Sequence, residues 1–230
     1  MLPKNIDDAS GHLHRKFIGA AGALLPLLII ILAARRPTDG LTPGEVLGSI
    51  SAYYYSGAIV VFVGTLAALS AFMLTYKGYG NDWYTLDRRT AILAGVAAAI
   101  VALNPATPPV ESLTPDWWTT WHGKTHYLAA ATLFSCFAFY CLVLFTKTGK
   151  GATPTPDKTR RNALYVFCGV GIIACMAWAL WSGWKKQSIF LPEAIALELF
   201  ALSWLVKGRI DYNILHPVQS VKDVLNAVKG

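Results

Sequence analysis

Residues 121–146 read WHGKTHYLAAATLFSCFAFYCLVLFT. Two histidines four positions apart, His122 and His126, stand where this stretch begins, and an almost uninterrupted apolar run follows them. The run 126–146 has 21 residues, and a helix needs about 20 to cross the hydrocarbon core of a bilayer. The stretch therefore predicts a transmembrane helix that carries both histidines on one face near one end.

The composition of the whole chain is that of a membrane protein. Its 230 residues are 54% hydrophobic and 14% charged, and the mean hydropathy is +0.44. Soluble domains of this size carry more charge, so we expect an all-α, polytopic membrane protein. The net charge of +7 does not indicate nucleic-acid binding, because basic residues gather at the cytoplasmic ends of membrane helices.

Six apolar runs are long enough, or nearly long enough, to cross a bilayer. The third is the weakest, but Gly95 and its neighbouring alanines suit a helix buried among other helices. We therefore expect six transmembrane helices, at 17–34, 56–76, 90–106, 126–146, 163–182 and 188–206.

The distribution of lysine and arginine predicts the orientation. Of the 20 basic residues, 15 fall on the side of the two termini and 5 on the other side. The positive-inside rule then places both termini in the cytoplasm, and we expect a multi-pass protein of a bacterial inner membrane. We expect the chain to consist of a cytoplasmic N-terminus (1–16), a six-helix membrane domain (17–207) and a cytoplasmic tail (208–230). The tail should contain a short amphipathic helix at 217–229.

Polar and aromatic side chains gather on the opposite, non-cytoplasmic face. They precede the second helix, end the third, open the fourth and begin the sixth. Tryptophan and tyrosine also concentrate at membrane interfaces for purely structural reasons, so each single aromatic residue has that simpler explanation. The candidate ligand-binding residues are Ser51, Tyr53, Tyr54, Tyr55, Asn104, His126, Glu193 and Glu198.

The spacing of His122 and His126 also fits two metal ligands on one helix face. A zinc site needs at least three protein ligands, and by helical rise Glu193 lies about 10 Å deeper than His126. Lys124 stands between the histidines, and the glutamate of the HExxH signature is missing. We favour histidines that hydrogen-bond nearby tyrosine or serine groups, and we expect no cofactor.

Glu193 and Glu198 are ionisable residues within the last expected span. Such residues cost at least about 2.5 to 3.5 kcal/mol to insert unless they have partners, so they are functional candidates. They are five positions apart, hence about 140° apart around the helix, and should not face one site. Glu198 either hydrogen-bonds between helices, with Ser135, Tyr140 or Ser203, or carries protons or substrate.

Nucleophile and base motifs are weak in this chain. It contains no GxSxG motif, no cysteine beside a histidine and no glycine-rich phosphate loop. Ser51 can neighbour His126 only if distant segments pack together, which the sequence does not determine.

Several short motifs occur in order along residues 15 to 210. They are Ser49-Ile-Ser51, Tyr53-Tyr-Tyr55, Gly78-Tyr-Gly80, Leu93-Ala-Gly95 through Asn104-Pro105, Thr125-His-Tyr127, and Glu198 in a span that ends Leu205-Val-Lys207. This pattern resembles the Frag/DRAM/Sfk-like family of six-helix membrane proteins. The resemblance implies a six-helix fold and a membrane or lipid-related role, without a catalytic chemistry to carry over. The seven-helix ceramidase and progestin-receptor-like hydrolases are a second comparison, for their HxxxH zinc chemistry alone.

These observations favour a non-enzymatic integral membrane protein that binds a lipid or small amphiphile in an outward-facing pocket. The alternatives are a zinc-dependent membrane hydrolase that uses His122 and His126, and a proton-coupled transporter that uses Glu198. The partners to consider are membrane lipids, a second copy of the chain, or another membrane protein.

Overall fold

The computed structural model describes residues 6–78, 84–147 and 155–209 of the chain. These residues form helices and no strand, which confirms the all-α prediction for the described part of the chain. The long helices are α1 (Ile6–Arg35), α2 (Ile59–Thr75), α3 (Tyr84–Leu103), α4 (Thr120–Phe139), α5 (Pro156–Trp184) and α6 (Phe190–Lys207). The short ones are the 3₁₀ helices η1 (Ser51–Tyr55) and η2 (Glu111–Leu113), and a π-helical turn, η3 (Tyr140–Leu144), that continues α4.

Three of these helices are long and apolar enough to cross a membrane. They are Gly11–Arg35, Thr120–Leu144 and Pro156–Trp184, and Ile59–Thr75 is a shorter apolar helix. Large apolar side chains point outward from them, such as Leu128 (72% exposed), Phe167 (67%) and Leu180 (75%). Water disfavours that much exposed apolar surface and lipid does not, so these helices indicate an integral membrane protein.

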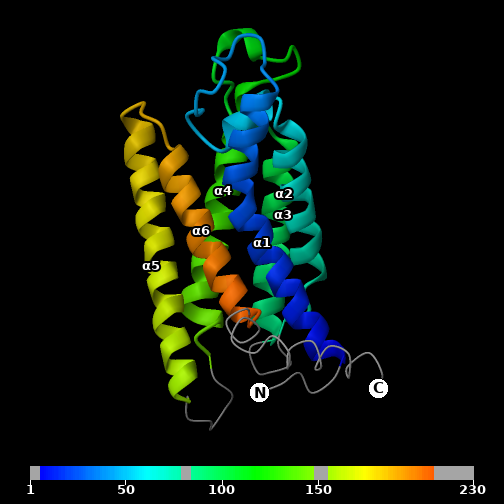
Figure 1. The fold of residues 1–230 in the computed structure, drawn as a ribbon, viewed down its shortest axis with the longest axis vertical. Coiled ribbons are helices and arrows are strands. Elements are labelled where there is room, and N and C mark those ends of the chain that lie inside the picture. The colour runs from blue at the N-terminus through cyan, green and yellow to red at the C-terminus, as the bar shows by residue number, and fades with distance from the viewer. Residues whose placement is uncertain (1–5, 79–83, 148–154, 210–230) are drawn as a thin grey trace.

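The long helices run up and down and form a closed ring (Figure 1). Each packs on its neighbours in chain order, and α6 packs back on α1. The packing is most extensive along α2, α3 and α4 and along α5, α6 and α1. The contacts of α1 with α2 and of α4 with α5 are smaller, so the ring consists of two three-helix halves that meet at two looser seams.

Glycine allows two of these helix pairs to approach closely. A Cβ atom on Gly19 of α1 would lie 2.8 Å from Leu205 Cγ and 3.0 Å from the Ala201 carbonyl oxygen, both on α6. A Cβ atom on Gly95 of α3 would lie 2.8 Å from Leu74 Cγ on α2. Small residues at such positions let backbones pack tightly where apolar surface alone gives no driving force within lipid.

Prolines set several helix ends. Pro105 follows the last turn of α3, and α3 ends there because a proline disfavours the helical conformation of the residue before it. Pro192 lies in the first turn of α6, where its missing N–H group costs no intrahelical bond. Pro192 therefore marks a helix start and not a kink, whereas Pro26 lies within α1, which continues through it.

The segments 36–58 and 104–119 cover one end of the ring, which we call the loop end (top of Figure 1). The first residues of α1 and the last of α6 lie at the opposite end. The expected amphipathic helix at 217–229, most of the tail 208–230, and Tyr79 and Gly80 of the expected turn lie outside the described residues.

Candidate functional site

The segment from Leu47 to Ser51 crosses the loop end of the ring and binds α6 through its main chain. The Gly48 carbonyl accepts hydrogen bonds from the Ile189 N–H (2.7 Å) and the Ser188 hydroxyl (3.2 Å). The Ile50 N–H donates to Glu193 Oε2 at 2.7 Å. Glu193 thus holds a loop residue 143 positions away in the sequence.

The next residue of the same segment contacts α4. His126 Nε2 lies 2.8 Å from Ser51 Oγ, and His126 Nδ1 lies 2.6 Å from the Asn104 carbonyl oxygen at the end of α3. The histidine is 1% exposed, so both ring nitrogens lie inside the protein. Glu193, the loop and His126 form a continuous hydrogen-bonded line across the end of the ring, which we call the cross-ring network.

The partners of His126 determine its tautomer. The Asn104 carbonyl can only accept a hydrogen bond, so the proton of a neutral imidazole is on Nδ1. Nε2 then carries a lone pair and accepts a hydrogen bond from the Ser51 hydroxyl. The geometry orients a serine hydroxyl toward an imidazole acceptor.

The tyrosines that follow Ser51 hold η1 in place. The Leu47 N–H donates to the Tyr53 hydroxyl at 3.3 Å, and the Tyr55 hydroxyl donates to the Ala106 carbonyl at 2.7 Å. Tyr54 packs edge-on against Tyr55, with 5.3 Å between ring centroids. These contacts fix the backbone that presents Ser51, and none of the three tyrosines lines the cavity described below.

Burial changes the acidity of two of these phenols. Desolvation and, to a smaller extent, the neighbouring Tyr54 and Tyr127 together raise the pKa of Tyr55 to about 12. Desolvation also raises the pKa of Tyr53, although the hydrogen bond from Leu47 opposes it. Both hydroxyls therefore stay protonated at neutral pH and keep their hydrogen-bonding roles.

Beneath the cross-ring network lies a cavity of about 50 Å³ between the two halves of the ring. α1, α2, α3, α4 and α6 all contribute to its wall, which is mostly apolar. Ser51 and Glu193 line it together, so the loop end of the cavity is polar. Its apolar wall includes Leu25, Phe62, Leu66, Leu133 and Leu197.

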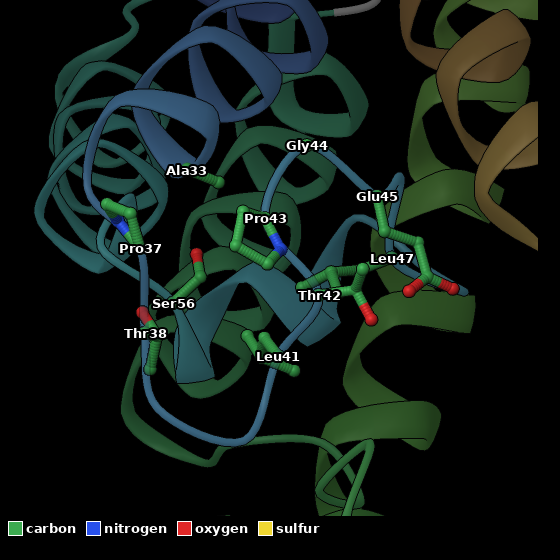
Figure 2. Close-up of a pocket in the computed structure, with 10 residues that line it drawn as sticks. All are labelled: Ala33, Pro37, Thr38, Leu41, Thr42, Pro43, Gly44, Glu45, Leu47 and Ser56. Carbon is green, nitrogen blue, oxygen red and sulfur yellow. The ribbon is translucent and has the colours of Figure 1, made fainter.

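A second hollow lies between the last turn of α1 and the loop 37–47 (Figure 2). It measures about 20 Å³, close to the least volume that can hold one water molecule. Pro37, Thr38 and Leu41 are among its lining residues. This hollow is too small for an organic ligand, so the cavity beneath Ser51 is the better candidate site.

Like the three tyrosines, His122 and Glu198 take no part in the cross-ring network. His122 Nδ1 accepts a hydrogen bond from the Thr119 N–H at 3.0 Å, so its ring closes the first turn of α4. Glu198 is exposed on the outer side of α6 and does not line the cavity. Among the described residues, no group of three His, Cys, Asp or Glu side chains could hold a metal ion.

The partners expected for Glu198 bond elsewhere. The hydroxyls of Ser135, Tyr140 and Ser203 donate to the carbonyls of Ala131, Asp87 and Phe200 respectively. These bonds correct the expectation that one of the three hydroxyls satisfies Glu198.

Main-chain groups complete the site, and the sequence could not reveal them. The Asn104 side chain donates to its own helix at the Ile100 carbonyl (3.0 Å), and only the Asn104 carbonyl reaches His126. The Ile50 N–H and the Gly48 carbonyl likewise act through backbone atoms that every residue type possesses. Pro105 is the one sequence feature that points to the Asn104 carbonyl, because a proline ends a helix and so frees the carbonyl of the preceding residue beside His126.

No protein-family model, curated protein or solved structure matches this chain. The resemblance to the Frag/DRAM/Sfk-like family therefore stays a prediction.

Proposed function

We propose that this chain is a six-span membrane protein with both termini in the cytoplasm, and that it binds a lipid or small amphiphile from the non-cytoplasmic side. The observation that carries the proposal is the apolar cavity whose loop end is lined by Ser51 and Glu193. An amphiphile needs such a pairing, with polar groups at one end and apolar wall behind them.

The arrangement of the helices supports six spans. α2, α3 and α6 are shorter than the three long apolar helices, but they alternate with them in direction and complete the same ring. A helix buried among others needs less apolar surface than one that faces lipid on most sides. The basic residues that the structure describes then lie mainly at the end opposite the loop end, as the positive-inside rule expects for cytoplasm.

The ligand would place its polar end near Ser51 and Glu193 and its apolar part among the leucines below them. Ala21 of α1 and Thr65 of α2 also line the cavity and are half-buried. They lie at the looser seam between the two halves of the ring, which gives an apolar chain a route toward the bilayer. The cavity of about 50 Å³ holds only a small part of such a ligand, and the rest of the chain would lie along this seam, so a membrane-borne amphiphile is favoured over a water-soluble ligand.

A matched pair of substitutions on α4 tests the binding proposal. Ala130 lines the cavity, whereas Ala131 is exposed on the outer side of the same helix. Ala130→Val adds two methyl groups to the cavity wall and should abolish retention of co-purified lipid in native mass spectrometry. Ala131→Val should retain lipid like the unchanged protein. Equal retention by both variants, or none by the unchanged protein, would contradict the proposal.

Cysteine labelling tests the spans and their orientation. Thr114 is exposed at the loop end and Asp157 is exposed at the start of α5, at the opposite end. A membrane-impermeant maleimide should label Thr114→Cys in intact cells and Asp157→Cys only after permeabilisation. The native cysteines are buried and serve as the background. Labelling of both positions in intact cells would refute the topology.

A further inference from the structure

We propose that Ser51 and His126 form a nucleophile and base pair that accepts a short acyl group from a carboxylic ester. The inference rests on the site proposed above, and it adds a chemical step to binding. It stands on the Ser51–His126–Asn104 geometry and on the cavity that Ser51 lines.

Three features of the geometry match an activated serine. Ser51 Oγ lies 2.8 Å from His126 Nε2, within the range of a nucleophile and its general base. A third group, the Asn104 carbonyl, orients the base through Nδ1 at 2.6 Å. That bond leaves the lone pair of the base on the nitrogen that faces the hydroxyl, as proton removal requires.

The step balances without any further reagent except water. Ser51 Oγ attacks the carbonyl carbon of the ester and forms a new C–O bond while its proton passes to His126 Nε2. The bond to the alcohol breaks, and the leaving oxygen takes that proton. Water then attacks the acyl-serine, gives a proton to His126 and releases the carboxylic acid, after which the serine recovers its proton from Nε2.

The cavity limits the acyl group. Its volume of about 50 Å³ is a few times the roughly 10 to 15 Å³ that one water molecule needs on the same measure, so an acetyl-sized group fits and a long chain does not. The wall around Ser51 is apolar apart from Glu193 and Thr65, which suits a small alkyl group. The acyl part of the ester would enter the cavity, and the alcohol part would face the loop end.

The backbone near the nucleophile predicts slow turnover. The Ile50 N–H donates to Glu193, and the Ala52 N–H donates to the Ser49 hydroxyl at 3.0 Å. Neither neighbouring N–H is therefore free to stabilise an oxyanion, and one such donor contributes about 10²- to 10³-fold in rate. We expect acylation of Ser51 to be observed more readily than sustained hydrolysis.

The competing explanation is structural, with His126 serving only to hold the loop to α4 and α3. Both explanations need the same hydrogen bonds, so loss of stability cannot separate them. They differ in the reactivity of Ser51 relative to nearby serines. Ser49 and Ser56 provide the comparison, because their hydroxyls bond to backbone groups and not to a histidine.

The test treats the purified full-length protein in detergent with p-nitrophenyl acetate. The expected result is a burst of p-nitrophenolate, at most one per chain, with the acetyl group mapped to Ser51. Ser51→Ala should remove the burst and Ser49→Ala should keep it. His126→Gln should slow acylation by about 10²-fold or more, the usual contribution of a general base.

A second variant keeps the test decisive if His126→Gln fails to fold. Ser51→Cys places a thiol beside the imidazole and should react with iodoacetamide at neutral pH at least 10-fold faster than Ser49→Cys. Equal thiol rates, absence of acetyl from Ser51 in the folded unchanged protein, or a faster burst with p-nitrophenyl palmitate than with the acetate would each overturn the inference. The unchanged protein separates the two proposals: retained lipid without acetyl on Ser51 would overturn the inference and leave the binding proposal standing, whereas acetyl on Ser51 without retained lipid would support the inference and contradict only the binding proposal.

Discussion

The two glutamates of α6 offer the sharpest test of the structure. Glu193 accepts the Ile50 N–H at 2.7 Å within the cross-ring network, whereas Glu198 is exposed on the other side of the helix. Glu193→Gln keeps an acceptor oxygen, and Glu193→Leu removes it and leaves the Ile50 N–H without this partner. The same two substitutions at Glu198 form the control.

The magnitudes follow from the bond that each variant retains. Glu193→Gln keeps a neutral acceptor for the Ile50 N–H, and such a bond contributes about 0.5 to 1.5 kcal/mol, so this variant should lower the free energy of unfolding by no more than about 1 kcal/mol. Glu193→Leu should lower it by about 2 to 3 kcal/mol, since a buried donor also loses its partner. The Glu198 variants should leave it unchanged or raise it slightly, because Glu198 is exposed and takes no part in the cross-ring network.

The assay is reversible unfolding of the purified chain in mixed detergent micelles, followed by tryptophan fluorescence. The expected order of stability is the unchanged protein, then Glu193→Gln, then Glu193→Leu, with both Glu198 variants at or above the unchanged protein. Equal losses for Gln and Leu at Glu193 would refute the role of the acceptor oxygen. Losses at Glu198 as large as those at Glu193 would refute the orientation of α6.

Two further predictions concern helix packing and the η1 anchor. Gly19→Ala forces a Cβ atom against α6 and should destabilise the protein by about 1 to 3 kcal/mol. Gly64→Ala has no atom within 4 Å of the new Cβ and should be neutral or stabilise α2 by up to about 1 kcal/mol. The same unfolding assay compares the two variants, and equal effects would contradict the close approach of α1 and α6. Tyr55→Phe removes the donor to the Ala106 carbonyl and should cost about 1 to 3 kcal/mol. Because the folded pKa of Tyr55 is raised from 10.0 to about 12, its contribution is complete below pH 10 and is lost as the pH rises toward 12, a loss that the Phe variant should lack.

The positions of the long apolar helices are largely predictable from local hydropathy. Length and hydropathy predict the runs 17–34 and 163–182, which fall within two of the three membrane-length helical segments, and the run 126–146, which overlaps the third (Thr120–Leu144) and extends two residues beyond it. The boundaries were less accurate, because caps and charged first turns extend a helix beyond its apolar part. α5 begins at Pro156, where the Thr155 side chain accepts the Lys158 N–H at 3.3 Å, ahead of the apolar run.

For the candidate site, the sequence predicts the residues but not the contacts between them. Residue type and position in the chain were enough to select Ser51, His126 and Glu193 for one face of the molecule, because polar groups within apolar surroundings are costly and so are informative. The sequence does not reveal which groups they contact, because Ser51 and His126 are 75 residues apart and Ile50 and Glu193 are 143 residues apart. The five-residue spacing of Glu193 and Glu198 predicts that they face different sides of α6, but only the structure shows which of the two reaches the loop and which is exposed.

By itself the sequence determined that this chain is helical and suited to a membrane, because hydropathy and helix length are properties of contiguous residues. It also marked the end of the molecule at which polar chemistry gathers. Only the tertiary structure decided that His126 receives the Ser51 hydroxyl, that Glu193 holds the Ile50 backbone, and that a small cavity lies beneath both. Those contacts depend on how six helices close into a ring and on main-chain groups that no residue type specifies.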